Sequence, residues 1–308
     1  MNQFLQELIL LTSPPASGKT YWINSFSESL GDQKLLVISP LRALAEECKI
    51  KWGEKITVMT PEEWLIKKTP FDVIVFDEFH LFFYWGDSFR PQMWEAFFEI
   101  SQNAKLIILL TATVSSAMKR EVQLFTCHFD SITWVDHGNQ ILRYKPSGYI
   151  KAPSLVWLLK QIESEKKNDG LKLIFCKYRE EVFTLEKELN HMGHRCISCV
   201  GGESKEMANK LLKIPDPDFI ICTTVLSHGV NLPKIKRIYF LYKIHQLDFW
   251  IQMVARGGRS GERFEVFSLE SPVGLKWSPL GNYFVVLLLS LKQNLRLDPL
   301  LRHFFISK

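Results

Sequence analysis

The sequence of 308 residues lacks the features of membrane-spanning, secreted and disordered proteins. Its longest apolar run, residues 283–289, is too short to cross a bilayer, and no low-complexity tract interrupts the chain. Polar Gln3, Gln6 and Glu7 break up the start, so we expect no signal peptide. These absences predict a cytoplasmic protein that does not have a membrane as a partner.

Cysteines are few: the six cysteines are scattered along the chain, mostly inside apolar runs. Such a distribution is typical of a reduced protein rather than of a disulfide scaffold. Cys196 and Cys199, with His191 and His194 just before them, could supply four zinc ligands. However, residues 195–200 read as a strand, in which an offset of three places the two thiols on opposite faces. We therefore expect buried cysteines and no zinc, with a zinc site as the alternative.

Charge of one sign is not in large excess either, since the net charge is +5. This modest bias permits a polyanionic partner without requiring one. Hydrophobic residues make up 46% of the chain, which is enough for a well-formed core, and the length suits two domains of ordinary size.

Short apolar runs alternate with amphipathic stretches that have a helical pattern, such as residues 41–51 and 180–192. Strands that alternate with helices predict parallel sheets with both faces covered. The expected strands are residues 8–11, 35–38, 56–59, 73–76, 106–110, 171–175, 195–199, 219–222 and 237–241.

A domain boundary is expected between about residues 133 and 153, where the pattern loosens and turn-forming sequences gather. We therefore predict an α/β protein of two tandem lobes with mostly parallel sheets, residues 1–145 and 146–270. A short helical tail, residues 271–308, follows. Its apolar residues are expected to pack on the second lobe.

A candidate phosphate-binding loop, Ser-Pro-Pro-Ala-Ser-Gly-Lys-Thr at residues 13–20, joins the first strand to a helical pattern. Backbone amides in such a loop bind phosphate oxygens. Lys19 would reach the β- and γ-phosphates, and Thr20 would ligate Mg²⁺. The rest of the phosphate cradle would come from Pro15, Ala16, Ser17 and Gly18. The alternative is an incidental Gly-Lys-Thr at a helix start.

Two acidic residues, Asp77 and Glu78, end the apolar run at residues 73–76. Ligands bind at the carboxyl ends of strands in parallel sheets, so this position suits a catalytic site. Asp77 would hold Mg²⁺ through water, and Glu78 would orient or deprotonate the attacking water. The alternative is a solvated acidic strand end.

An aromatic-rich stretch follows the two carboxylates directly. Trp85 and Phe89 are suited to stacking on bases, and Arg90 is suited to binding phosphates. The alternative is that this stretch only packs, because Phe82, Phe83 and Tyr84 could equally lie in the core. Small polar or basic residues at other strand ends could grip a nucleic-acid backbone: Ser39, Arg42, Thr60, Thr111, Thr113 and, in the second half, Thr223.

In the second half, Gln252, Arg256 and Arg259 are spaced i, i+4 and i+7, so we expect them on one helix face. Placed across a cleft from the phosphate loop, the two arginines could neutralise charge that develops on the γ-phosphate. The alternative is a basic helix face on the surface.

Together these segments resemble the superfamily 2 helicases. Seven segments occur in the order of that family's motifs I, Ia, II, III, IV, V and VI: residues 13–20, 39–45, 77–80, 111–113, 173–179, 223–233 and 252–259. The resemblance covers about residues 5–262. It implies two RecA-like lobes, ATP and Mg²⁺ as cofactors, nucleotide contacts from Gly229 and Asn231, and nucleic-acid contacts from His80.

Within that superfamily, the RecQ helicases carry a W-G-x-x-F-R-P loop after their DEAH box, and residues 85–91 are similar to it. This resemblance implies an ATP-dependent DNA helicase that moves 3′ to 5′ as a monomer on single-stranded or tailed duplex DNA. Two alternatives stay open. The protein is an RNA-dependent ATPase of the DEAH type, or a nucleotide-gated clamp that binds nucleic acid without unwinding it.

The sequence departs from the family pattern at several positions. Ser13 replaces the first glycine of the phosphate loop, Phe79 replaces the alanine of the DEAH box, and Met253 and Ala255 replace the usual arginine and glycine of motif VI. Only seven residues precede the first expected strand, too few for the adenine-reading motif that the family carries upstream, so we expect weak discrimination among nucleoside triphosphates. No zinc module or winged helix is expected after residue 262, which favours translocation or ATPase activity over efficient unwinding.

Overall fold

The computed structural model describes residues 6–86, 90–102, 104–127, 129–201, 204–224, 232–270 and 286. The chain divides into two compact units, Met1–Arg143 and Tyr144–Lys308. The segment expected as a helical tail, residues 271–308, lies outside the described residues apart from Val286.

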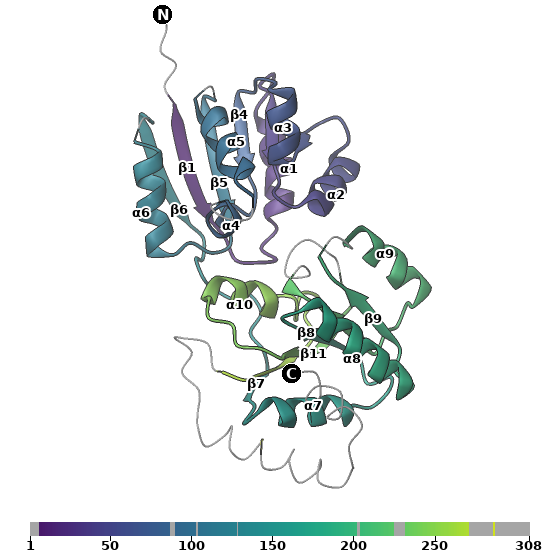
Figure 1. Ribbon diagram of the computed structural model, residues 1–308. Coiled ribbons are helices and arrows are strands. Elements are labelled where there is room, and N and C mark those ends of the chain that lie inside the picture. The colour runs from purple at the N-terminus through teal and green to yellow at the C-terminus, as the bar shows by residue number, and fades with distance from the viewer. Residues whose placement is uncertain are drawn as a thin grey trace, which may run out of the picture. The chain divides into compact units, whose positions relative to one another are not determined.

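Six parallel strands form the sheet of the first unit, in the order β3-β2-β4-β5-β1-β6 (Figure 1). These strands are β1 (Glu7–Thr12), β2 (Leu35–Ile38), β3 (Thr57–Met59), β4 (Val73–Phe76), β5 (Leu106–Thr111) and β6 (Ser131–Asp136). The helices between them are α1 (Lys19–Ser29), α2 (Arg42–Trp52), α3 (Pro61–Lys67), α4 (His80–Trp85), α5 (Gln92–Ser101) and α6 (Ser116–Phe125).

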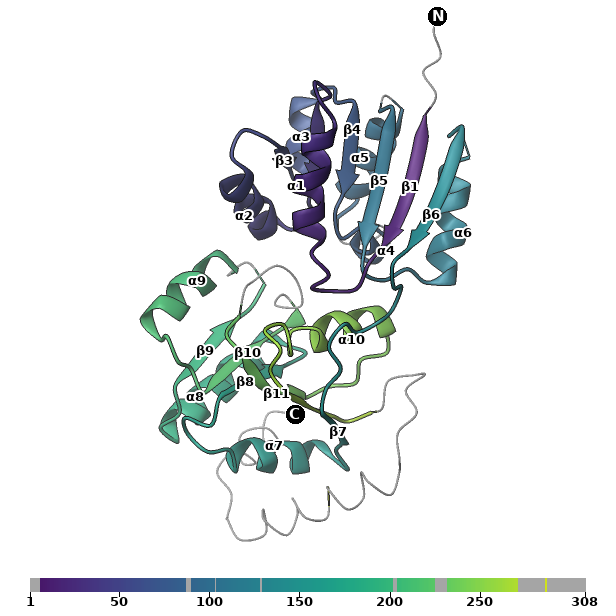
Figure 2. The same cartoon turned by 180° about the vertical axis from the view of Figure 1, so that it is seen from behind.

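Helices cover both faces of this sheet, as the apolar strands require. Ile23 of α1 and Cys48 and Trp52 of α2 pack on one face against valines and isoleucines of the strands, and Figure 2 shows α1 and α2 in front of the sheet. On the other side, Phe76 at the end of β4 meets Phe82 of α4 and Phe97 of α5 at centroid distances of 5.4 and 5.2 Å. This packing fixes the end of β4, where the acidic pair begins.

The second unit repeats the architecture with six parallel strands in the order β7-β12-β11-β8-β10-β9. Its strands are β7 (Gly148–Lys151), β8 (Leu171–Phe175), β9 (Cys196–Cys199), β10 (Phe219–Cys222), β11 (Ile235–Phe240) and β12 (Glu265–Ser268). Its helices are α7 (Leu155–Glu163), α8 (Arg179–His191), α9 (Ser204–Lys213) and α10 (Leu247–Val254).

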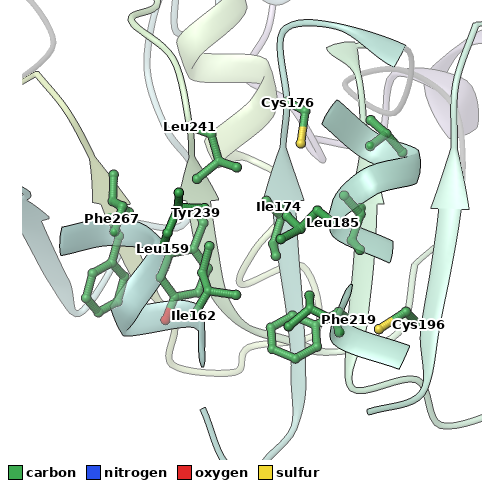
Figure 3. Close-up of a cluster of buried hydrophobic side chains, with 14 of the residues drawn as sticks. Leu159, Ile162, Ile174, Cys176, Leu185, Cys196, Phe219, Tyr239, Leu241 and Phe267 are labelled. Carbon is green, nitrogen blue, oxygen red and sulfur yellow. The ribbon is translucent and has the colours of Figure 1, made fainter. Parts of the chain in front are cut away.

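A single apolar cluster joins α7 and α8 to one face of this second sheet. Figure 3 shows Leu159 and Ile162 of α7 and Leu185 of α8 beside strand residues that include Ile174 and Tyr239. Val286, beyond the last strand, also packs against this cluster. Each unit therefore has its own core, which confirms the prediction of two α/β lobes with parallel sheets.

The prediction for residues 133–153 was incomplete, because this region contains two strands rather than loop alone. β6 and β7 each lie at an edge of their sheet. Edge strands bury less surface, and β6 alternates between exposed and half-buried residues, so it has no continuous apolar run to reveal it. The interior strand β12 also went unpredicted.

Cys196 and Cys199 are both buried at the two ends of β9. His194 lies edge-on to Phe219 at a centroid distance of 5.0 Å. In the parts of the chain that the structure describes, no three His, Cys, Asp or Glu side chains gather as metal ligands. Among the same residues, no helix is long and apolar enough to cross a membrane.

Candidate functional site

The phosphate loop joins β1 to α1 at the carboxyl edge of the first sheet (Figures 1 and 2). Ala16 (φ 60°) and Gly18 (φ 93°) both have left-handed backbone conformations, which turn the chain sharply before the helix. The hydroxyls of Ser13 and Ser17 are hydrogen-bonded to each other at 2.6 Å across the loop. Serine at the position of the family's first glycine is thus accommodated by a bond that closes the loop.

The first turn of α1 is well suited to an anion. Its N-cap residue, Gly18, offers no side-chain cap, and no acidic residue lies in the first turn. The backbone amides there are not occupied by a capping side chain, and the helix dipole adds partial positive charge. Lys19 folds back over the loop, with its Nζ 3.4 Å from the Ser13 carbonyl oxygen.

Asp77 and Lys19 come together at this edge although 58 positions separate them in the chain. Burial, together with the neighbouring Glu78 carboxylate, raises the pKa of Asp77 to about 7, and the charge of Lys19 opposes the rise. The opposing effect of Lys19 requires its ammonium to lie near this carboxylate. A basic group that is suited to phosphate therefore lies beside two carboxylates that are suited to Mg²⁺.

Glu78 lies in a tight turn after β4, with a left-handed backbone (φ 48°). Its amide donates to Asp77 Oδ1 at 2.9 Å, and its Oε2 lies 3.5 Å from Nδ1 of His80. Left-handed backbone is uncommon for residues other than glycine and costs roughly 1–3 kcal/mol where it occurs. The turn fixes the Glu78 carboxylate next to the acidic strand end.

His80 connects this acidic turn to the strand end of β5. The side chain is buried, and its Nδ1 lies 2.9 Å from the hydroxyl oxygen of Thr111. The Thr111 hydroxyl in turn donates to the Thr113 carbonyl oxygen at 3.1 Å. Buried polar groups of this kind are costly unless they are hydrogen-bonded. The contacts from Glu78 through His80 and Thr111 to Thr113 therefore form a buried network rather than an exposed surface for nucleic acid.

Arg90 is tied to two segments of the first unit. Its guanidinium makes a forked ion pair with Glu62, at 2.6 and 2.7 Å from Nη2, and its Nη1 donates to the Pro40 carbonyl oxygen. Arg90 was predicted to bind phosphates, whereas here it joins the aromatic stretch to the segment after β2. Glu62 was not predicted as the ion-pair partner of Arg90, because a pairing across 28 positions leaves no local pattern in the sequence.

The aromatic stretch divides between core and surface. Phe82 is buried, as the packing alternative predicted, whereas Phe83 and Tyr84 are half-buried, as is Trp85 at the end of α4. The Arg90 amide donates to the Trp85 carbonyl oxygen at 2.6 Å. Phe89 lies outside the described residues.

The other polar residues at strand ends lie at the same edge, but in different environments. Ser39 is buried, with its hydroxyl 3.4 Å from the Leu41 carbonyl oxygen, and Arg42 is exposed at the start of α2. Thr60 caps α3: its hydroxyl accepts from the Glu63 amide at 3.3 Å, and Glu63 Oε2 accepts from the Thr60 amide at 2.9 Å. The Thr60 side chain is thus committed to a capping box.

Replacing Thr60 with alanine should therefore lower the free energy of unfolding of the first unit by about 1 kcal/mol, because the helix loses its cap. Thr60→Ser, which keeps the hydroxyl, should restore most of that loss. Urea denaturation followed by circular dichroism measures both variants. A variant that binds nucleic acid less tightly at unchanged stability would show instead that Thr60 contacts nucleic acid.

In the second unit, the expected single helix face does not form. α10 ends at Val254, and Gly258 has a left-handed backbone (φ 76°), so Arg256 and Arg259 lie in the turns beyond the helix. The Gly258 and Ser260 amides both donate to the Glu262 carboxylate at 2.9 Å, which stabilises this turn.

Gln252 and Arg256 are nonetheless buried, and Arg259 is half-buried with its Nε donating to the Ala255 carbonyl oxygen at 3.0 Å. Burial holds the pKa of the Cys222 thiol well above its usual value, and the positive charge of Arg256 opposes that rise. Arg256 therefore lies near the carboxyl end of β10, where Thr223 follows.

Thr223 is half-buried, and its amide donates to the Cys199 carbonyl oxygen at 3.3 Å, which continues the pairing of β10 with β9. Gly229 and Asn231, the other residues expected in this segment, lie outside the described residues. The second unit thus places Thr223 and Arg256 at the carboxyl edge of its own sheet.

Comparisons with known proteins agree with this architecture. Residues 153–261 match the helicase conserved C-terminal domain. ATP-dependent RNA helicase DBP3 of Candida glabrata is 23% identical over 275 residues, which cover 74% of this chain and 50% of that protein. The bifunctional 3'-5' exonuclease/ATP-dependent helicase WRN of Mus musculus is 23% identical over 226 residues, which cover 67% of this chain and 15% of that protein.

Among solved structures, Saccharomyces cerevisiae Dbp5 bound to RNA and ADP BeF3 has a TM-score of 0.64 at 15% identity, covering 97% of this chain and 85% of that chain. At that identity the likeness shows the fold: two RecA-like lobes. The chain spans about half the length of the DBP3 relative. The comparisons support a superfamily 2 helicase, but the closer resemblance to RecQ is not confirmed, because most of the named relatives are RNA helicases.

Proposed function

We propose that this protein hydrolyses ATP in response to single-stranded nucleic acid and uses the cycle to move along or remodel that strand. The observation that carries the proposal is that the phosphate loop with Lys19 and the acidic pair Asp77 and Glu78 both follow strands of one parallel sheet at its carboxyl edge, near enough for the charge of Lys19 to act on Asp77. A helix start without a side-chain cap, a lysine and two carboxylates are what phosphoryl transfer needs from one lobe.

Within this proposal, each residue of the first unit has a specific role. The loop amides and Lys19 bind the β- and γ-phosphates. Glu78, held by its left-handed turn, accepts a proton from the attacking water or orients it. The hydrogen bond between His80 and Thr111 links the Glu78 turn to the strand end of β5.

Thr20 and Asp77 would hold Mg²⁺. The site fits this ion because burial and the adjacent Glu78 carboxylate raise the pKa of Asp77, and a bound cation would stabilise the ionised form of both carboxylates. When bound, Mg²⁺ supplies charge neutralisation for the phosphates.

The second unit would contribute Arg256 and Arg259 to the same triphosphate, with Gln252 beside them. Closure of the two units around ATP, followed by reopening after hydrolysis, would then drive movement along the strand. Gly229 and Asn231 stay candidates for nucleotide contact from this unit.

RNA is the substrate class that the relatives favour. DBP3 is named an RNA helicase, and the Dbp5 structure contains RNA. A second candidate, single-stranded DNA, is supported by the Trp-Gly and Arg-Pro pairs at residues 85–91 and by the match to mouse WRN. Both substrates share a phosphate backbone, so affinity for either should fall as salt increases.

The test is ATP hydrolysis by the purified chain with no nucleic acid, with single-stranded RNA and with single-stranded DNA of matched sequence, followed by strand displacement on tailed duplexes. We expect stimulation by RNA to exceed stimulation by DNA. Stimulation by DNA alone would establish the second candidate. Hydrolysis that neither polymer changes would refute the proposed function, and stimulation without displacement would identify a clamp.

Trp85→Ala should spare basal ATP hydrolysis and remove most of its stimulation by nucleic acid. Trp85 is the last residue of α4, its side chain is half-buried, and its backbone carbonyl accepts from the Arg90 amide. A base stacked on an aromatic side chain contributes typically ~1–3 kcal/mol. Trp85→Phe, which keeps a stacking face, is the matched control. If stimulation survives in Trp85→Ala, the side chain only packs against its neighbours.

A further inference from the structure

The segment that leaves the first unit, residues 136–143, runs beside the phosphate loop and the turn after β5. The Asp136 carboxylate accepts from the Thr12 hydroxyl at 2.9 Å, at the residue just before the loop. Asn139 binds Val114 through two hydrogen bonds: its Oδ1 accepts from the Val114 amide at 2.7 Å, and its Nδ2 donates to the Val114 carbonyl oxygen at 2.8 Å. This segment is therefore fixed both to the start of the phosphate loop and to the turn after β5.

Gly138 allows that close approach. Its backbone is in the left-handed region (φ 126°), and a Cβ placed there would lie 2.8 Å from Cγ of Pro14 in the phosphate loop. No side chain fits in that space, so the segment and the loop are packed backbone against ring. The His137 amide adds a hydrogen bond of 2.8 Å to the Thr12 carbonyl oxygen.

Arg143 makes the last of these contacts, with its Nη1 2.7 Å from the Ala16 carbonyl oxygen. Ala16 is the residue of the phosphate loop that has a left-handed backbone without being glycine. That conformation is unfavourable for alanine, so it needs support from its surroundings. A guanidinium bound to its carbonyl oxygen provides support at the place where the loop is strained.

We propose that Arg143 is a positioning residue for the triphosphate, which holds the left-handed turn at Ala16 so that the following amides face the phosphates. The inference rests on the proposed nucleotide site. Arg143 is also the last residue of the first unit, so the residue that contacts the phosphate loop is bonded directly to Tyr144, where the second unit begins.

The test is a double-mutant cycle with Arg143→Ala and Ala16→Gly, measured as ATP binding and as kcat and KM for hydrolysis. Arg143→Ala should raise the KM and Kd for ATP about 5- to 10-fold with kcat changed much less, because the lost bond positions the loop rather than the attacking water. Arg143→Lys, which can still donate to the carbonyl, should recover part of the affinity. Arg120→Ala, at an exposed arginine of the same unit, is the matched control and should change neither parameter.

Ala16→Gly is the decisive partner, because glycine adopts the left-handed conformation freely. In the Ala16→Gly background, removal of Arg143 should cost only about twofold in ATP affinity, since the strain that Arg143 opposes is gone. An equal loss in both backgrounds would overturn the inference and indicate a direct contact with the nucleotide. An Arg143→Ala protein with unchanged KM and Kd would overturn it as well.

Failure of the proposed nucleotide site and failure of the positioning role of Arg143 give different experimental results. If the wild-type chain neither binds nor hydrolyses ATP, the nucleotide site itself is wrong, and this inference falls with it. If the wild-type chain hydrolyses ATP and Lys19→Ala does not, while every Arg143 variant behaves as wild type, only the positioning role of Arg143 is refuted.

Discussion

Lys19→Ala is expected to abolish ATP hydrolysis while single-stranded nucleic acid still binds. The charge of the Lys19 ammonium acts on Asp77 at the carboxyl edge of the sheet. Lys19 is also the one basic residue in the loop sequence 13–20, so the loop has no second cation to bind the γ-phosphate. The hydrogen bond that the Lys19 ammonium makes to the Ser13 carbonyl oxygen is long, at 3.4 Å, so little folding stability depends on it. Steady-state phosphate release and fluorescence anisotropy with a labelled oligonucleotide measure the two properties separately.

The matched control for that variant is Lys55→Ala, at an exposed lysine of the same unit. It should hydrolyse ATP as the wild type does. Thermal unfolding of both variants verifies that they fold. Undiminished hydrolysis by folded Lys19→Ala would exclude this loop as the nucleotide site.

The second large effect is expected at Arg259. Arg259→Gln should lower turnover by roughly 10³-fold or more, the range found when an arginine that stabilises a phosphoryl-transfer transition state is removed. The affinity for ATP should change far less, because the contact strengthens as charge develops. Arg259 suits this test better than the buried Arg256, whose removal would also leave a cavity beside Cys222.

Arg263→Gln supplies the control, since Arg263 is exposed four residues further along the same segment. Single-turnover hydrolysis at saturating ATP and nucleic acid isolates the chemical step. If Arg259→Gln hydrolyses ATP at the wild-type rate, the second unit does not contribute this residue to catalysis.

The interior strands were predictable because burial on both faces gives continuous apolar runs. β2, β4, β8 and β10 begin and end where their apolar residues do. β6 and β7 could not be found in this way, because edge positions tolerate alternating and turn-forming residues.

The candidate site was predictable to the extent that topology places it. Parallel strands bring their carboxyl ends to one edge, so the phosphate loop and Asp77 had to be neighbours once both were assigned to strand ends. The partners of individual side chains could not be read in the same way. The Arg90 pair with Glu62 joins positions far apart in the chain, and the helical spacing of Gln252, Arg256 and Arg259 did not reveal that α10 ends at Val254, before both arginines.

Thr60 illustrates a different limit. A threonine after a strand and before Pro-Glu-Glu is consistent with both a gripping residue and a helix cap, and the capping box at Glu63 was visible in the sequence as Thr-x-x-Glu. The Thr-x-x-Glu pattern therefore favours the helix cap that the structure contains. Short polar clusters at strand ends need to be tested for capping before they are assigned to a ligand.

The central claim is that one triphosphate is served by residues from both units, and hydrogen–deuterium exchange tests it most directly. With a non-hydrolysable ATP analogue and single-stranded RNA bound, the account predicts slower exchange both in residues 13–20 and in residues 252–261 of the wild-type chain, and neither change in Lys19→Ala. Protection confined to the first unit, with exchange at residues 252–261 unaltered by nucleotide and RNA together, would contradict it.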